Sequence, residues 1–117
     1  MEEFQYVNLE YLELMTEGDE EMQKEMLGML MVEFENEIPK MKISNMAEDW
    51  VELGNLSHKF KSTLNFVGNE LMTEANEHVE KISKSRVNTG KITDLIDILE
   101  DLSSKVVVEL RDAYETI

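Results

Sequence analysis

Helix-breaking residues are scarce in this chain, and their scarcity constrains the fold more than any other feature of the sequence. The 117 residues include one proline and five glycines. Apolar residues recur at spacings of three and four instead of alternating with polar residues, which is typical of amphipathic helices and not of strands. We therefore predict an all-α fold.

The first part of the chain is expected to form a short helix and then a long one. The short helix covers about residues 9–15 and ends at the sequence "TEGD". The long helix begins at Asp19 or Gly18, where the acidic residues that follow favour the helix dipole. Pro39 should kink or end this helix, because proline removes a backbone donor and crowds the preceding turn. The sequence "KISNM" is then expected to lead to the next helix.

Three further helices are expected after this connection. Asp49 and Glu52 have the spacing of a capping box at the start of the third helix, which ends at the turn formed by Gly68 and Asn69. A polar loop, "SKSRVNTGK", separates the fourth helix from the fifth. The inward apolar positions of the four long helices are Leu27, Leu30, Phe34, Ile38 and Met41; Leu53, Leu56, Phe60, Leu64 and Val67; Met72, Ala75, Val79 and Ile82; and Ile92, Leu95, Leu99, Leu102, Val106, Leu110 and Ala113. This pattern predicts an up-and-down four-helix bundle with a short extra N-terminal helix.

The composition limits the compartments and partners that are open to this chain. Its length suits a single domain over residues 1–117, and the absence of cysteine excludes disulfides and favours a cytoplasmic location. The N-terminus lacks the basic and apolar regions of an export signal, and no apolar run is long enough to span a membrane. The 26 acidic and 11 basic residues give a formal charge of −15, which argues against nucleic acid and anionic membranes as partners. A monomer is the simplest expectation.

His58 is predicted to lie on the side of the third helix that faces water. A rotation of about 100° per residue places it about 160° from the centre of the apolar stripe. The residues one turn away are small or polar: Gly54, Asn55, Lys61 and Ser62. A partner protein could therefore bring a reactive group close to the ring, and Lys61 could neutralise an anion bound there. On geometry alone, the simpler interpretation is a solvated surface histidine without a chemical role.

A docking surface is expected around the predicted position of His58. Val51 and Phe66 are apolar residues that fall outside the buried stripe and near the histidine, so they could form an apolar rim. Gly54 and Asn55 would keep the surface beside the ring low enough for a partner to approach.

The pattern His-x-Phe-Lys-Ser-x-x-x-x-x-Gly, which starts at His58, resembles the motif of the histidine-containing phosphotransfer (HPt) family. The family motif is His-x-Leu-Lys-Gly, with a further glycine ten places after the histidine. His58, Phe60, Lys61 and Gly68 match the histidine, apolar, lysine and turn-glycine positions. The resemblance covers most of the chain, because the short first helix, the Gly-Asp turn and the long second helix also have counterparts in the family. Ser62 departs from the pattern, since the family usually has glycine there.

This resemblance implies a phosphorelay carrier without kinase activity of its own. The Nε2 atom of His58 would accept a phosphoryl group from a phospho-aspartate on a receiver domain and pass it to an aspartate on a second receiver. Lys61 would offset the charge of that group, and Ser62 and Asn55 are weaker candidates for orienting it. No cofactor of its own is implied, because the Mg²⁺ used in the transfer would sit on the partner receiver domain. The alternative is a helical adaptor that binds a signalling protein without being phosphorylated.

Other motifs do not predict a second chemistry. The sequence "NTGK" at 88–91 lacks the first glycine and the Lys-Ser/Thr ending of a phosphate-binding loop. The paired Glu-x-x-His motifs of carboxylate-bridged metal bundles are missing, since residue 75 is alanine and residue 55 is asparagine, so no metal site is expected. His78 lies at the edge of the apolar stripe of the fourth helix and is expected to be a partly buried packing residue.

Overall fold

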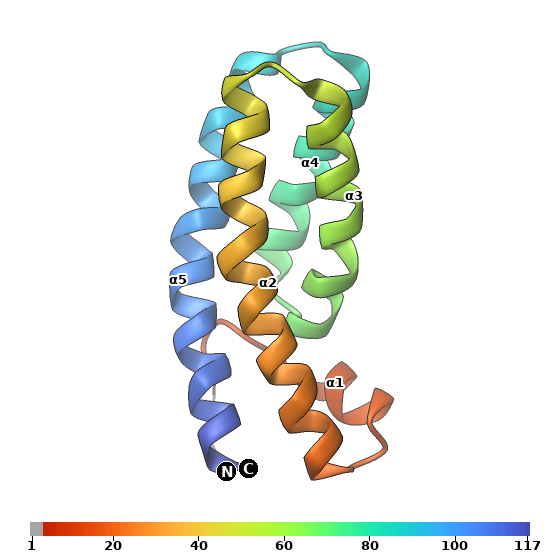
Figure 1. The fold of residues 1–117 in the computed structure, drawn as a ribbon, viewed down its shortest axis with the longest axis vertical. Helices are drawn as coiled ribbons and strands as arrows, with labels where there is room; N and C mark the ends of the chain where they lie inside the picture. Colours follow the sequence, from red (N-terminus) through yellow and green to blue (C-terminus); the bar gives the residue numbers. More distant parts are fainter. Residues whose placement is uncertain (1–3) are drawn as a thin grey trace.

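The computed structural model describes residues 4–117, which form helices and no strands. The helices are α1 (Glu10–Met15), α2 (Glu20–Met46), α3 (Trp50–Val67), α4 (Glu70–Ser85) and α5 (Ile92–Thr116), with a short 3₁₀ helix, η1 (Thr89–Lys91), before α5 (Figure 1). The predicted all-α fold is confirmed, and the short first helix is present although it begins one residue later than expected. No helix within residues 4–117 is long and apolar enough to cross a lipid bilayer.

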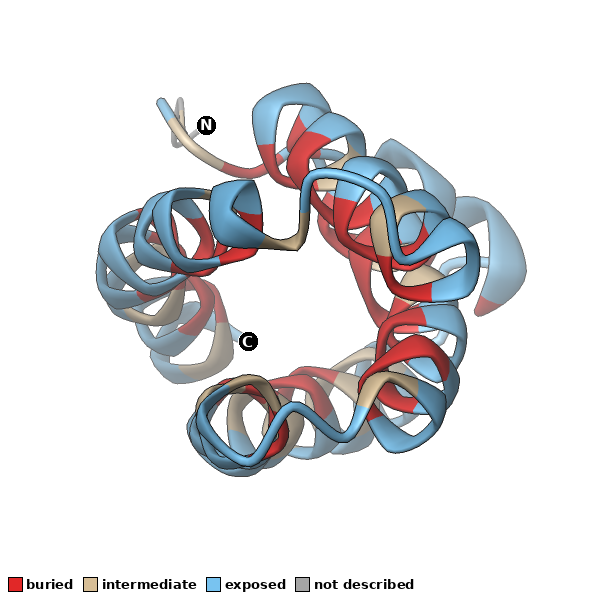
Figure 2. Cartoon of the chain, turned by 90° about the horizontal axis from the view of Figure 1, so that it is seen from above, coloured by how far each residue is buried: buried red, intermediate tan, exposed pale blue. Residues whose placement is uncertain are grey.

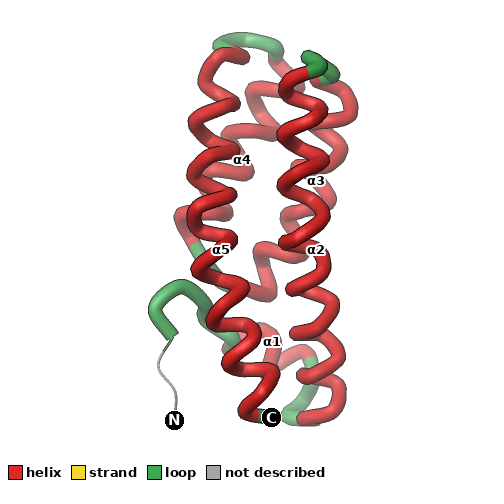
Figure 3. The backbone as a smooth tube through the Cα atoms, turned by 60° about the vertical axis from the view of Figure 1, so that its left-hand side comes forward, coloured by secondary structure: helices red, strands yellow, loops and turns green. Residues whose placement is uncertain are grey.

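The four long helices form the predicted bundle around one core. Each of them packs on two neighbours, so that α2, α3, α4 and α5 close into a ring with short connections at its two ends (Figure 3). Seen along the bundle, the buried residues line the inner sides of this ring (Figure 2). The core contains the apolar positions predicted from the periodicity, except that Ile82 and Leu95 are only partly buried against it.

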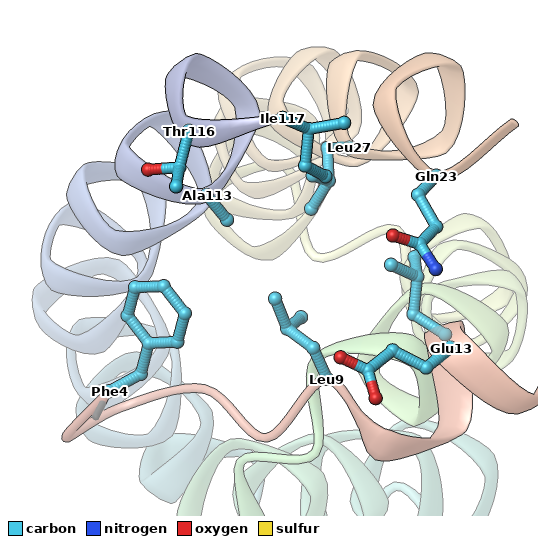
Figure 4. A pocket seen from close by; sticks show the side chains of 9 residues that line it. Phe4, Leu9, Glu13, Gln23, Leu27, Ala113, Thr116 and Ile117 are labelled. Carbon is cyan, nitrogen blue, oxygen red and sulfur yellow. The ribbon is translucent and has the colours of Figure 1, made fainter. Parts of the chain in front are cut away.

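One end of the bundle is extended and holds α1. With 27 and 25 residues, α2 and α5 are longer than α3 and α4, which have 18 and 16. The short helix α1 occupies the extended end and packs on α3, where the rings of Tyr11 and Phe66 lie 5.1 Å apart. A mainly apolar cavity of about 210 Å³ lies between α1 and the ends of α2 and α5, lined in part by Phe4, Leu9 and Leu27 (Figure 4).

Pro39 lies inside α2 and does not end it, so the predicted connection at "KISNM" is wrong. The helix continues through this sequence to Met46. Met41 and Ser44 lie beyond the proline and are buried, whereas Pro39 is exposed. The ring therefore faces solvent, where water can hydrate the Glu35 carbonyl that proline deprives of its usual donor. Packing on both sides of Pro39 holds the helix together.

Polar side chains cap three helices at the positions that the sequence indicates. Asp19, Asp49 and Asn69 each accept a hydrogen bond from the backbone N–H three residues later, at the starts of α2, α3 and α4. The end of α4 differs from the prediction, because the helix runs to Ser85 and includes the first residues of the expected loop. Arg86 ends it in a left-handed conformation with a φ of 59°.

Residues 5–8 cross one side of the bundle, and we call them the N-terminal strap. The backbone N–H groups of residues 5–7 lie 2.7 to 3.1 Å from the carboxylate oxygens of Glu109 on α5 and donate to them. The next residue, Asn8, donates its backbone N–H to the last residue of α3. Gly68 follows α3 with a φ of 70°, and a Cβ atom there would lie 2.8 Å from the Asn8 carbonyl oxygen. Glycine is therefore required where the strap meets the turn between α3 and α4.

Candidate functional site

The ring of His58 projects from α3 into solvent beside α4. Its side chain is 66% exposed, as the helical periodicity predicts, and its Nδ1 atom lies 2.8 Å from Oε2 of Glu80. The Glu80 side chain is 7% exposed, because it lies on the inner side of α4. An accessible imidazole is thus anchored to a buried carboxylate on the neighbouring helix.

The carboxylate of Glu80 binds two lysines in addition to the histidine. Lys61 on α3 lies 2.8 Å from Oε1, and Lys84 on α4 lies 2.8 Å from Oε2. Lys84 and His58 therefore share one carboxylate oxygen, whereas Lys61 binds the other. We refer to His58, Lys61, Glu80 and Lys84 as the Glu80 cluster.

The two lysines keep Glu80 ionised although it is buried. Hydrogen bonds from Lys61 and then Lys84 lower the pKa of the Glu80 carboxyl to about 2, while burial opposes this shift and His58 adds a smaller lowering. The same hydrogen bond to Glu80 raises the pKa of the Lys61 amine. At neutral pH the Glu80 cluster therefore holds one carboxylate and two ammonium groups beside the imidazole.

The contact with Glu80 determines which ring nitrogen of His58 can act as a nucleophile. In a neutral imidazole one nitrogen carries the proton and the other carries a lone pair. An ionised carboxylate accepts hydrogen bonds, so the proton belongs on Nδ1, which faces Glu80. The lone pair is then on Nε2, the nitrogen that Glu80 does not contact.

Small and polar residues set the register between α3 and α4 beneath the cluster. The Ser57 hydroxyl donates a hydrogen bond to Oδ1 of Asn76 at 2.8 Å, and the Asn76 amide donates to the Ser57 carbonyl at 2.9 Å. Both side chains are completely buried. One turn earlier, a Cβ atom on Gly54 would lie 3.6 Å from the Cβ atom of Ser83, so the helices are close there. This register places the carboxylate of α4 opposite the imidazole of α3.

The other predicted site residues lie in different settings around the histidine. Asn55 and Ser62 are exposed, each about one turn from it, and Val51 is exposed two turns before it. Gly54 is buried between α3 and α4 instead of lying open to solvent. Phe66 is partly buried and packs on α1. Val51, Asn55 and Ser62 therefore provide accessible surface near the ring, whereas Phe66 contributes mainly to packing.

His78 does not pack in the core, and its predicted role is wrong. Its side chain is 56% exposed, and its Nε2 atom lies 4.0 Å from the carboxylate of Glu74 one turn earlier. The position at the edge of the stripe falls on the outer surface of α4, where the side chain can extend into water. Within residues 4–117, the ion-pair partner of His78 is Glu74, which is not part of the Glu80 cluster.

Glu80 and Lys84 are functional candidates that were not predicted from the sequence. A signal for Glu80 was present, because the inner face of α4 carries Asn76, Glu80 and Ser83 in the same register as its apolar residues. Polar groups at buried positions need partners, so such a row indicates a polar contact with a neighbouring helix. The sequence does not indicate which helix supplies these partners. The packing of α4 on α3 shows that His58 and Lys61 of α3 bind Glu80.

No group of three or more histidine, aspartate or glutamate side chains within residues 4–117 is placed to hold a metal ion. Comparisons with protein-family models, with curated proteins and with solved structures found no match. The site itself presents an exposed imidazole, with its proton directed to Glu80, beside two ammonium groups.

Proposed function

We propose that this protein is a phosphorelay carrier, in which His58 accepts a phosphoryl group from a phospho-aspartate on one receiver domain and passes it to an aspartate on another. The observation that carries the proposal is the anchoring of Nδ1 at 2.8 Å from Glu80 while the ring remains exposed. The resemblance of residues 58–68 to the HPt motif points to the same role. The chain would act as a carrier and not as a kinase.

The proposed transfer uses Nε2 of His58 as the nucleophile. Its lone pair attacks phosphorus while the bond from phosphorus to the aspartyl oxygen breaks, and the aspartate leaves as a carboxylate. The proton stays on Nδ1, and the positive charge that develops on the ring is offset by Glu80. In the second step an aspartate of the other receiver attacks phosphorus, the N–P bond breaks and the neutral imidazole returns. The ring therefore exchanges no proton with solvent in either step.

The receiver would supply most of the remaining machinery. The resemblance assigns the Mg²⁺ ion to the receiver, together with the aspartate and a further lysine. Lys61 is 44% exposed while it contacts Glu80, so its ammonium group is accessible to a phosphoryl group on the ring. The main contribution of the bundle is then to present the nucleophile in a fixed orientation.

The acceptor role predicts that His58→Gln abolishes phosphorylation. The protein is mixed with a receiver domain that carries labelled phospho-aspartate, and acid-labile, base-stable label is followed on the carrier. His78→Gln is the matched control, because His78 is also exposed but lies outside the Glu80 cluster. Label should appear on the wild type and on the control. Absence of label with several receivers would contradict the proposal, and stable binding to a receiver without label would support the adaptor instead.

The charge-offsetting role predicts that Lys61→Ala slows transfer by about tenfold. The free energy of unfolding should change little, since Lys61 is partly exposed and Glu80 keeps its contact with Lys84. Lys59→Ala removes an exposed lysine from the same helix and serves as the control. Rapid-quench transfer rates and urea denaturation measure the two effects, and equal rates for both variants and the wild type would refute the role.

A further inference from the structure

Lys84 lies close to the imidazole, on the side where α4 approaches α3. Its Nζ atom and Nδ1 of His58 each lie 2.8 Å from the same oxygen of Glu80. The two nitrogens are therefore no more than twice this distance apart. Lys61 has no such common oxygen with the ring, because it binds Oε1. A second ammonium group is thus held beside His58 by the geometry of one carboxylate.

A cavity of about 250 Å³ opens between α3 and α4 next to Lys84. Its lining residues are Trp50, Val51, Gly54, Asn55, Ser83, Lys84 and Arg86. Side chains on a helix lean toward its N-terminus, so the ring of His58 extends over the turn that contains Gly54 and Asn55. Gly54 lines the cavity, and a Cβ atom there would lie 3.6 Å from Cβ of Ser83 and 3.9 Å from Cγ of Lys84, so the missing side chain lets α4 come close to α3.

The cavity is basic although the chain as a whole is strongly acidic. Lys84 and Arg86 line it, and none of its lining residues is acidic. The formal charge of the whole chain is −15. Arg86 adopts a φ of 59°, a left-handed conformation in which a helix usually ends with glycine or asparagine. Arg86 follows Lys84 and Ser85 directly, and it lines the cavity together with Lys84.

We propose that this cavity binds a phosphate-class oxyanion, with Lys84 and Arg86 as the cations that hold it. Its natural occupant would be the phosphoryl group on Nε2 of His58, and this assignment of the occupant rests on the proposed function. The ammonium group of Lys84 stays on the oxygen that also anchors Nδ1, so one carboxylate positions both the nucleophile and a binding cation. Asn55 and Ser83 line the same space and add polar surface to it.

Two measurements without any receiver domain test the site. In the first, inorganic phosphate is titrated into the protein, and the amide resonances of Gly54, Asn55 and Lys84 are followed by NMR. In the second, His58 is phosphorylated by phosphoramidate, where Nε2 attacks phosphorus, the P–N bond of the donor breaks and its protonated nitrogen leaves as ammonia. The reaction is run at one pH and one ionic strength for all variants.

We expect saturable shifts with a dissociation constant in the millimolar range, and weaker binding by about threefold in Lys84→Gln and in Arg86→Gln. The rate of phosphorylation by the anionic donor should fall by a similar factor in both variants. Lys81→Gln, which removes an exposed lysine of the same helix, should leave both quantities unchanged. The Arg86 variant leaves the contacts of Glu80 intact, so it separates loss of the anion site from rearrangement of the cluster.

The absence of saturable shifts, or equal binding and rates in Lys84→Gln, Arg86→Gln and the wild type, would overturn the anion site. Such a result together with receiver-dependent labelling of His58 would leave the carrier function standing. The opposite result, in which the anion site is intact but no receiver labels the protein, would remove the phosphoryl group as its occupant and the carrier function with it.

Discussion

Glu80 is one buried carboxylate shared by an imidazole and two ammonium groups, and its ionisation holds the site together. The pKa of its carboxyl is about 2 in the folded protein against an ordinary value of 4.5. A carboxyl with a lowered pKa binds fewer protons in the folded state than in the unfolded state, so it stabilises the fold above the ordinary pKa. This stabilisation is lost as the pH falls from about 4.5 through about 2.

Glu80→Gln is expected to lower the free energy of unfolding by about 1–2 kcal/mol at pH 7, because the lysines lose an ionised partner. The difference from the wild type should shrink below pH 4.5 and become small near pH 2, where about half of the folded wild-type molecules have a neutral Glu80 carboxyl. Urea denaturation at several pH values measures it. Glu74→Gln, at an exposed site on the same helix, should be nearly neutral throughout. If the wild type and Glu80→Gln differed in free energy of unfolding by the same amount at every pH from 7 to 2, the result would contradict this account.

At the scale of single residues, the sequence predicts on which side of its own helix a side chain lies. It does not predict which residues of a neighbouring helix that side chain contacts. The exposure of His58 follows from its angle to the apolar stripe, and the structure agrees. Gly54 has a similar angle, yet it is buried because α4 passes close to it. Glu80 was not predicted because its role depends on the distance between two helices, which no spacing within α4 encodes.

At the scale of elements, helix starts set by polar caps and the end of α3 at Gly68 were predictable, whereas the effect of Pro39 and the end of α4 were not. The caps at Asp49 and Asn69 act through hydrogen bonds to their own helices, so the sequence contains the whole interaction. Pro39 and the residues after Ile82 are poor signals in comparison. Both lie where burial on the inner side of the bundle stabilises further helical turns and outweighs the local preference.

The contact between α3 and α4 depends on the buried pair of Ser57 and Asn76. We expect Ser57→Ala to lower the free energy of unfolding by about 1–3 kcal/mol, because the buried amide oxygen of Asn76 loses its donor. Ser62→Ala is the matched control at an exposed position of the same helix, and its effect should stay within about 0.5 kcal/mol. Chemical denaturation measures the free energy of unfolding of both variants. Similar losses for the two would show that the pair does not stabilise the contact between α3 and α4.

At the scale of the whole molecule, the N-terminal strap ties together parts of the chain that are far apart in sequence. The strap binds Glu109 of α5 on one side and the last residue of α3 on the other. The periodicity predicted the bundle and its core, since both follow from apolar stripes on amphipathic helices. The strap carries no periodic pattern, and its hydrogen bonds to Glu109 and to α3 are donated by backbone groups. Its side chains therefore did not predict where it binds.

Gly68→Ala tests the junction between the strap and the turn from α3 to α4. We expect it to lower the free energy of unfolding by about 2–4 kcal/mol, because the new Cβ atom would lie 2.8 Å from a backbone oxygen of Asn8 and the left-handed backbone is unfavourable for alanine. Gly18→Ala separates the two causes. Gly18 also has a positive φ, of 79°, but nothing lies within 4 Å of its added Cβ atom, so about 1 kcal/mol is expected. Equal losses in thermal or chemical unfolding would mean that the junction is not tightly packed.

The pairing of the strap with Glu109 also fixes an order of assembly. The backbone groups of residues 5–7 and their carboxylate partner are separated by 102 to 104 positions. During synthesis the strap therefore leaves the ribosome more than 100 residues before its acceptor. Closing so long a loop is entropically slow compared with joining helices that are adjacent in sequence. The strap should therefore dock after the four long helices have met, and it fastens a bundle that is already in place.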